Sequence, residues 1–185
     1  SDLLAKLKLD GVVMRSVDSE HFLLPFEEIE SQFPQGKHIM MEHFYRRMRK
    51  RFDILMQDGK PMGGKWNYDA NNRNKLKAKD IEQLPKPLMF SHDVSDIVER
   101  LGRHNIQTIG KLNGDLLWPV SRSQSLSLLA HFCQVCLPLF GRFQDAMTGQ
   151  HEAKWSLYHS RISFSLNSKL LNPREVIDAS LKAFH

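Results

Sequence analysis

The stretch that decides the fold is His159-Ser160-Arg161-Ile162-Ser163-Phe164-Ser165-Leu166, which runs on to Leu171-Asn172-Pro173-Arg174-Glu175-Val176. It contains two predicted helix starts in succession. Ser160 is suited to cap the first helix, with Ser163 three residues later. The second start has Asn172 as N-cap, Pro173 at the first helical position and Glu175 at the third. We therefore predict two consecutive helices here, in a second half of the chain that is all-α.

The first helix start has two interpretations. Unpaired N–H groups and the positive end of the helix dipole converge at a helix N-terminus and attract anions. The hydroxyls of Ser160 and Ser163 add two donors at the same place, which is typical of a phosphate-binding site. The alternative is a pair of well-capped helices without a ligand. The residues by themselves leave both open.

The same stretch resembles the segment of photolyases and cryptochromes that holds the flavin pyrophosphate. That segment reads Thr-Ser-x-Leu-Ser, then a leucine, then Leu-Ser-x-Arg. The positions here that match it are Ser160, Ile162, Ser163, Leu166, Leu171 and Arg174. The chain departs from it at His159, Phe164 and Asn172, where the family usually has threonine, proline and serine.

Three further motifs are similar to one branch of that family. They are Met62-Gly63-Gly64-Lys65-Trp66-Asn67-Tyr68-Asp69-Ala70-Asn71-Asn72-Arg73, Trp118-Pro119-Val120-Ser121-Arg122 and Phe140-Gly141-Arg142-Phe143-Gln144-Asp145-Ala146-Met147. They resemble the bacterial deoxyribodipyrimidine photolyase-related proteins, an iron–sulfur branch whose characterised members repair (6-4) photoproducts. The motifs occur in the family's order from Val17 to the end of the chain, which argues against a chance match.

This resemblance implies a function. FAD would be held by His159, Ser160, Arg161, Ile162, Ser163 and Arg174, of which Arg174 has a structural role as its alternative. Light-driven electron transfer from FAD would repair UV-damaged pyrimidines in DNA. A cryptochrome-like blue-light photoreceptor is the alternative within the family. Family members are longer, so we expect this chain to be an internal fragment that is inactive alone. The iron–sulfur cluster and the antenna chromophore are expected only in the full-length parent, and no catalytic residue is assigned.

We expect a mixed α/β fold that is mainly α, in three parts. Residues 1–56 would be the end of an N-terminal, nucleotide-binding-like α/β domain plus a basic helix. Residues 57–90 would be an interdomain connector, and residues 91–185 the N-terminal part of a helical FAD-binding domain. In the first part, helices at 2–9 and 26–33 alternate with strands at 12–17 and 38–41, which predicts the remnant of a parallel sheet.

Two helices are predicted in the second half before the deciding stretch. The first begins at 91 and would bury Val94, Ile97, Val98 and Leu101. The next is capped by Ser121 or Ser123 and ends at Pro138, and Gly141 breaks the chain again. Its predicted buried face holds Leu126, Leu129, Ala130, Cys133 and Leu137.

A basic helix is predicted at 43–56. The formal net charge of +5 favours a polyanionic partner, and a helix face crowded with arginine and lysine is suited to phosphate contacts. The nucleic-acid candidates are Arg46, Arg49, Lys50, Lys65, Trp66 and Arg73. The alternative is a solvated helix face, with Trp66 and Tyr68 pinning the connector to the surface. From this comes a second class of function, a non-enzymatic basic nucleic-acid-binding module.

Other familiar sites are excluded by their missing parts. Cys133-Gln134-Val135-Cys136 has no second cysteine pair, so we expect core residues and no metal ligands. The chain contains no HExxH, Gly-x-Ser-x-Gly or Walker motif. It has two cysteines, no signal peptide and no apolar run near the length of a membrane span, from which we expect a cytoplasmic protein without a membrane partner.

Overall fold

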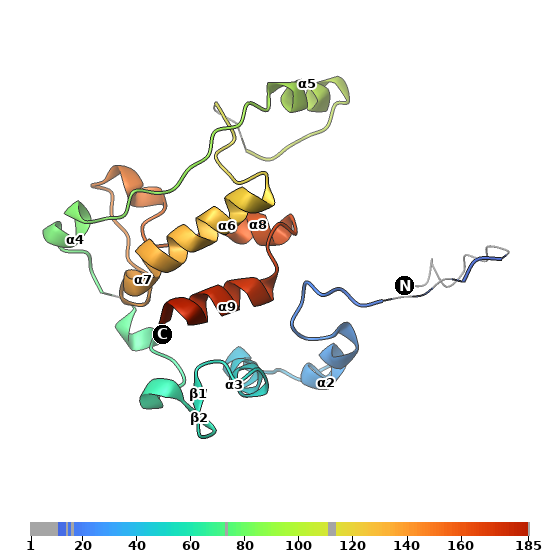
Figure 1. Cartoon of the computed structure of the whole chain (residues 1–185), viewed down its shortest axis with the longest axis vertical. Coiled ribbons are helices and arrows are strands. Elements are labelled where there is room, and N and C mark those ends of the chain that lie inside the picture. Colours follow the sequence, from blue (N-terminus) through green and yellow to red (C-terminus); the bar gives the residue numbers. More distant parts are fainter. Residues whose placement is uncertain (1–10, 14, 16, 73, 111–113, 185) are drawn as a thin grey trace. The chain divides into compact units, whose positions relative to one another are not determined.

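The computed structural model describes residues 11–13, 15, 17–72, 74–110 and 114–184 (Figure 1). The chain separates into two units, residues 1–38 and 39–185. The described part of the chain as a whole is mainly helical.

The described part of the first unit contains one short helical segment and is otherwise irregular. A 3₁₀ turn η1 at Phe26–Glu28 continues into α2 at Ile29–Gln32, which confirms the helix predicted after Pro25. The Asp18 carboxylate accepts a hydrogen bond of 2.6 Å from the Phe26 amide. No strand forms at the described positions of 12–17, so that prediction is wrong for them. The helix predicted at 2–9 lies outside the described residues.

The second unit begins with α3, Met41–Arg51, so the helix starts where a strand was predicted. An antiparallel hairpin follows, with β1 at Met56–Gln57 paired to β2 at Lys60–Pro61. Asp58 and Gly59 both have positive φ, at 50° and 73°, as a two-residue hairpin turn requires. This hairpin is the sheet found among the described residues, and the expected parallel remnant is absent there.

The segment predicted as a connector carries short helical turns. They are η2 at Met62–Gly64, η3 at Asp69–Asn71 and α4 at Ala78–Glu82. An extended run then leads to a single antiparallel bridge between His92 and Leu116. The segment between the two bridge residues contains α5, Ser95–Arg103. On this helix Ile97 and Val98 are each 48% exposed. The apolar face predicted for α5 is therefore only partly buried.

One long helical run forms the centre of the unit. It consists of α6 at Arg122–His131, a π-helical turn η4 at Phe132–Cys136, and α7 at Leu137–Phe143. Ser121 is the N-cap, because its hydroxyl accepts a hydrogen bond of 3.3 Å from the Gln124 amide. The predicted stop at Pro138 is wrong. Pro138 lies in the first turn of α7, directly after the π turn, where the missing proline N–H is tolerated.

The core packs around this run. The buried face carries Leu128, Leu129, Phe132, Cys133 and Cys136. The predicted face was rotated, since Leu126 and Ala130 are exposed. Both cysteines are free and buried, as expected for core residues. Among the described residues Arg122–Phe143 is long and apolar enough to cross a membrane, contrary to the sequence expectation, but it is also the core helix of this unit.

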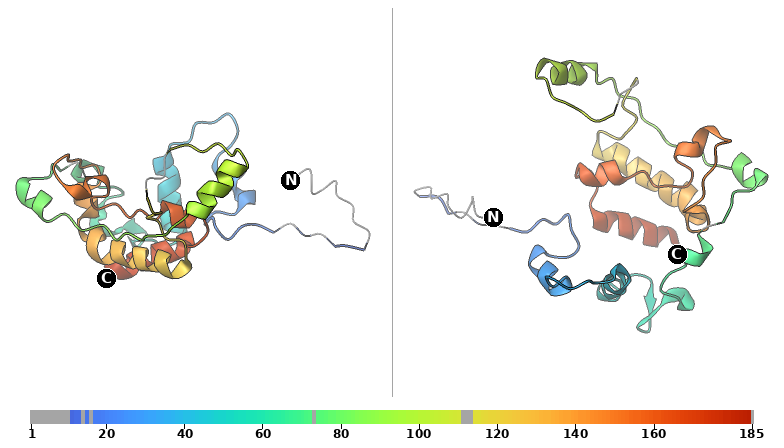
Figure 2. Two further views of the ribbon diagram at one scale, coloured as in Figure 1. Left: turned by 90° about the horizontal axis from the view of Figure 1, so that it is seen from above. Right: turned by 180° about the vertical axis from the view of Figure 1, so that it is seen from behind.

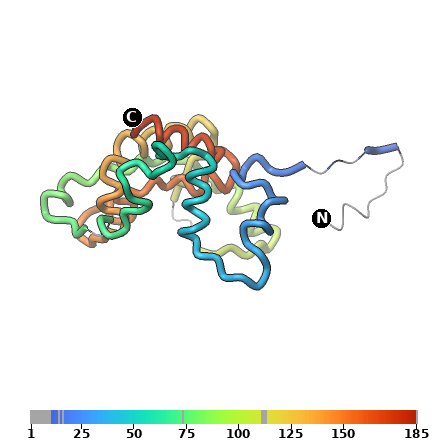
Figure 3. The backbone as a smooth tube through the Cα atoms, turned by 90° about the horizontal axis from the view of Figure 1, so that it is seen from below, coloured from blue at the N-terminus to red at the C-terminus, as the bar shows by residue number. Residues whose placement is uncertain are grey.

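The C-terminal part supplies the rest of the unit. After the 3₁₀ turn η5 at Glu152–Trp155 come α8 at Ser163–Asn167 and α9 at Pro173–Phe184. Helix α9 packs beside α6 and the π turn, as the views in Figures 1 and 2 show. Figure 3 traces the backbone of this unit from α3 to α9.

The two predicted helix starts have different outcomes. Asn172 caps α9 as predicted, with Oδ1 accepting from the Arg174 amide at 2.8 Å. In return, Glu175 Oε2 accepts a hydrogen bond of 2.9 Å from the backbone N–H of Asn172, which completes a capping box. The prediction for Ser160 is wrong, because α8 begins at Ser163 and has no side-chain cap.

Candidate flavin-phosphate site and basic surface

The loop between η5 and α8 is held in a fixed path by buried side chains. Leu157, Tyr158 and Ile162 point into the core. Leu157 and Arg161 have left-handed φ values of 43° and 56°, a conformation that L-residues adopt only where the surroundings impose it. The turn at Arg161 explains why the helix starts after Ile162 and Ser160 stays outside it.

Arg161 is half-buried and connects this loop to the extended run after α4. Its Nη2 donates a hydrogen bond of 2.5 Å to the Leu88 carbonyl oxygen, and its guanidinium carbon lies 5.0 Å from the centre of the Trp155 ring. Burial lowers the pKa of Arg161 from its ordinary value. Since that value is so far above neutrality, we take the guanidinium as charged.

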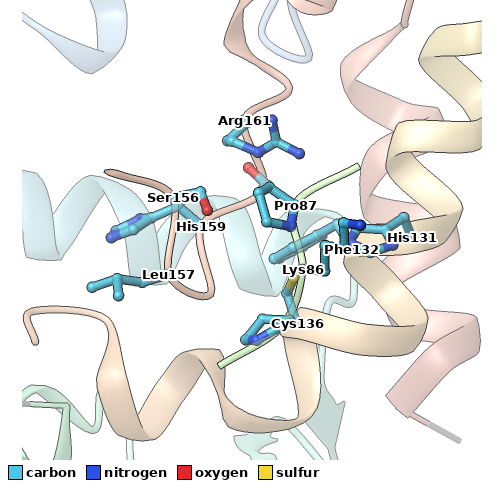
Figure 4. A pocket seen from close by; sticks show the side chains of 11 residues that line it. Lys86, Pro87, His131, Phe132, Cys136, Ser156, Leu157, His159 and Arg161 are labelled. Carbon is cyan, nitrogen blue, oxygen red and sulfur yellow. The ribbon is translucent and has the colours of Figure 1, made fainter. Parts of the chain in front are cut away.

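A pocket forms where three segments meet. Pro85, Lys86 and Pro87 come from the extended run, His131, Phe132 and Cys136 from α6 and the π turn, and residues 156, 157 and 159–161 from the loop. Figure 4 shows these side chains converging. The side chains fill this pocket, with no room for a water molecule between them. A ligand must therefore bind at its edge or displace Lys86 or Arg161.

The helix side of the pocket is kept uncharged. Burial, with a contribution from the Arg161 charge, lowers the pKa of His131 from 6.5, so the imidazole is neutral at pH 7. Burial raises the pKa of the Cys136 thiol, with Arg161 opposing. His131 Nε2 is buried and has no hydrogen-bond partner among the described residues. The positive charge at this pocket therefore comes from Arg161 and Lys86.

The structure brings together only part of the predicted flavin set. His159, Ser160 and Arg161 line the pocket. Ile162 is a core residue that fixes the loop, and Ser163 is exposed at the start of α8. Arg174 stacks over Phe52 at 5.5 Å, and it does not line the pocket. As a donor set, a hydroxyl, a guanidinium and an ammonium fit a phosphate.

A second hollow adjoins the first. It has a volume of about 610 Å³ and shares Ser156, Leu157 and His159 with the smaller pocket. Asp145, Met147 and Trp155 are among its other lining residues. A volume of this size is within the range of cofactor pockets.

Sequence reasoning missed Lys86 and Trp155 as parts of this site. Lys86 lies between two prolines in the connector, and only the fold carries it to the loop some seventy residues later. Its one sequence signal is the extended conformation that flanking prolines favour. Trp155 stands close to the deciding stretch, but its contact with Arg161 depends on the turn of the loop.

The predicted nucleic-acid residues differ in how exposed they are. Arg49 is buried at 7% exposure, and its guanidinium donates to the carbonyl oxygens of Ile54, Leu55 and Trp66 at 3.0, 2.6 and 3.3 Å. It therefore holds the hairpin and the following loop against α3. Lys50 and Lys65 are exposed and available to a polyanion, Arg46 is half-buried against Glu42, and Arg73 lies outside the described residues.

Trp66 connects the loop to α3. Arg46, Arg49 and Lys50 each place a cation 5.3 to 5.6 Å from the centre of its ring. These contacts hold the loop against α3, as expected for Trp66. The three cations that make them are ones predicted to contact nucleic acid. Within the described part of the chain, no three His, Cys, Asp or Glu side chains gather as metal ligands.

Comparison with known proteins agrees with the resemblance. The model of the family described as deoxyribodipyrimidine photo-lyase-related protein matches residues 2–117. A (6-4) photolyase of Agrobacterium fabrum is 33% identical over 180 residues, which cover 95% of this chain and 34% of that protein. An uncharacterized protein of Acanthamoeba polyphaga mimivirus is 46% identical over 41 residues, 22% of this chain and 21% of that protein.

The chain thus spans about a third of the length of the curated photolyase that it matches. The family match covers more than half of the chain, through α3, the hairpin and α5. On this ground the chain belongs to the deoxyribodipyrimidine photo-lyase-related protein family.

Proposed function

We propose that this chain holds the phosphates of FAD in a photolyase that repairs UV-damaged pyrimidines in DNA. The observation that carries the proposal is the convergence of Ser160, Arg161 and Lys86 at one pocket. The family and the similarity to a (6-4) photolyase support the same reaction class.

Each side chain has a distinct part in binding. Positive charge comes from Lys86 and from Arg161, whose side chain is fixed by Leu88 and Trp155. Ser160 supplies a hydroxyl donor. The neutral His131 and Cys136 give the pocket a wall of low polarity, which strengthens electrostatic attraction at its edge. The larger hollow past His159 offers space for the remainder of the cofactor.

FAD would supply a photoexcited electron to the damaged pyrimidines, and the protein would supply position and electrostatics. A flipped-out lesion is the substrate that enzymes of this kind reach most easily, because a damaged pair costs less to unstack. Exposed Lys50 and Lys65 are suited to the phosphate backbone of the DNA. A longer protein that includes this chain would provide the remaining flavin contacts, and we place it in the cytoplasm.

Flavin retention tests the binding part of the proposal. The purified chain is mixed with excess FAD and desalted, and its absorption in the flavin band is recorded. We expect retained flavin, and less of it in Ser160→Ala. Ser163→Ala is the matched control, because Ser163 is exposed and does not line the pocket. This variant should retain as much flavin as the parent chain, meaning the 185-residue chain without substitutions. Retention that is equal in all three proteins would contradict the assignment of Ser160.

Repair is tested in a longer protein. The segment of the Agrobacterium (6-4) photolyase that matches this chain is replaced by residues 1–185, and the hybrid is illuminated with a UV-damaged oligonucleotide. We expect repair above a dark control. A folded, flavin-loaded hybrid without repair would contradict the proposed reaction and leave the flavin assignment standing.

A further inference from the structure

A pocket that shares no residue with the candidate flavin site lies on the surface of α3. Its volume is about 560 Å³, and its walls include Tyr45, Trp66, Tyr68 and Phe184. Four aromatic rings in one pocket of this size form a stacking surface for a planar ligand. Nothing in the proposed flavin function uses this pocket.

The walls are held in place before any ligand arrives. The Trp66 carbonyl oxygen accepts from Arg49, and the Tyr68 hydroxyl donates to the Gly63 carbonyl oxygen at 3.1 Å. Asn67 Nδ2 donates to Glu42 Oε1 at 3.2 Å. Binding therefore does not have to order this loop, and a pre-ordered site binds more tightly for the same contacts.

The polar groups of the lining favour a particular kind of planar ligand. Within the described residues, no hydrogen bond or ion pair engages the Asp69 carboxylate, and Asn67 uses only its amide nitrogen. Both side chains can accept hydrogen bonds from a ring that carries an amino group. Adenine, guanine and cytosine have such a group on their edge.

Positive charge stands beside the aromatic walls. The Lys50 ammonium lies 5.5 Å from the centre of the Trp66 ring, and Lys50 has no ion pair among the described residues. Lys65 directly precedes Trp66 and is exposed. A phosphate attached to a base stacked in the pocket would meet these cations.

We propose that this pocket binds one nucleotide, with its base among the four aromatic rings and its phosphate at Lys50 and Lys65. The chemistry is shared by a free mononucleotide and by a nucleotide of a single strand. The proposal does not depend on the flavin function, because the two pockets have separate linings.

Calorimetric titration with AMP tests the proposal. We expect one AMP per chain, adenosine bound about tenfold more weakly, and no heat from ribose 5-phosphate, because the base makes the main contact. A titration with the deoxyadenosine trinucleotide separates the two sources. Equal affinity for AMP and the trinucleotide assigns a free nucleotide, and binding that needs the trinucleotide assigns a strand.

Variants at one position separate the ring from its hydroxyl. Tyr68→Ala should weaken AMP about tenfold or more, since a stacking ring is lost. Tyr68→Phe should stay within about threefold of the parent chain, because it keeps the ring. Lys60 is exposed on the hairpin that precedes the pocket loop and does not line the pocket, so Lys60→Ala is the surface control and should not change the affinity.

A second variant tests the proposal independently, in case Tyr68→Ala does not fold. Lys50→Gln should weaken AMP several-fold and leave adenosine unchanged, which reduces the difference between the two ligands. Binding of neither AMP nor the trinucleotide by the folded chain, or an unchanged affinity in a folded Tyr68→Ala, overturns the proposal. So does an equal loss of AMP and adenosine in Lys50→Gln.

Discussion

Arg161 Nη2 donates a hydrogen bond to the Leu88 carbonyl oxygen, 73 residues earlier in the chain. This bond joins the loop before α8 to the extended run that also carries Lys86. Arg161 and Lys86, two of the three groups that we assign to phosphate binding, are thus brought together by one contact between distant segments.

Arg161→Ala should lower the free energy of unfolding by about 1 to 3 kcal/mol, because a charge-assisted hydrogen bond and the stacking on Trp155 are both lost. Arg161→Lys keeps the charge but should recover only part of the lost stability, since the lysine ammonium lacks the planar hydrogen-bonding fork of the guanidinium. Urea unfolding measures both. Equal stability of the alanine variant and the parent would show that the Leu88 contact contributes nothing.

Two adjacent glycines give a matched pair for the loop at Trp66. Gly63 and Gly64 have φ values of 75° and 74°, but a Cβ on Gly63 would meet the Tyr68 hydroxyl oxygen at 2.1 Å, and one on Gly64 would meet nothing within 4 Å. Gly64→Ala should cost about 1 to 2 kcal/mol from the left-handed backbone alone. Gly63→Ala should cost clearly more.

Tyr68→Phe removes the clashing oxygen and provides the test of that cause. Gly63→Ala should destabilise a Tyr68→Phe background less than it destabilises the parent chain. Melting curves of the four proteins give the coupling. Additive effects would mean that the close approach is not the reason for glycine at 63.

Arg49→Ala should be among the most destabilising changes of a charged residue here, by about 2 to 4 kcal/mol. It leaves the carbonyl oxygens of Ile54, Leu55 and Trp66 without their donor. Arg47→Ala is the control on the same helix, at an exposed position, and should change stability by about 1 kcal/mol or less. Similar losses for both would contradict the structural role of Arg49.

The contact of Glu175 with Arg122 predicts a dependence on pH. Hydrogen bonds from Arg122 and from the Asn172 amide lower the pKa of Glu175 below its ordinary 4.5. Its contribution to stability is therefore present above pH 4.5 and is lost as the pH falls below that value. Glu175→Gln should remove this pH-dependent contribution to stability. It should keep the cap of α9, since the side-chain oxygen of the glutamine can still accept from the Asn172 backbone N–H.

Chemical unfolding of the parent chain and Glu175→Gln from pH 3 to 7 checks this. The two stability curves should converge as the pH falls. Parallel curves would show that the carboxylate charge is not what stabilises the junction of α6 and α9.

Local sequence signals predicted those elements whose partners lie within a few residues. Asn172 with Glu175, and Ser121 with Gln124, are caps that form within one helical turn. The first is confirmed as predicted, and Ser121 is one of the two caps predicted for its helix. The hairpin has a similar local signal in Asp58-Gly59, although the composition of the surrounding segment favours a connector.

Predictions that needed a distant partner were less successful. The β-branched run at 12–17 reads as a strand, but a strand requires a neighbour to pair with, and none pairs with its described residues. The burial of Arg49 and the arrival of Lys86 beside Arg161 likewise depend on tertiary contacts. The domain boundaries and the roles of the site residues stay predictions, which only binding and repair measurements test.

The central claim is that Ser160 and Arg161 hold the phosphates of a flavin. The most direct test measures the affinities of FAD and riboflavin for the parent chain and for a Ser160→Ala, Arg161→Gln double variant. The account predicts that FAD binds at least about tenfold more tightly than riboflavin, and that the variant loses this difference while still binding riboflavin. Equal affinities for the two flavins in the parent chain, or an unchanged difference in a folded variant, would contradict it.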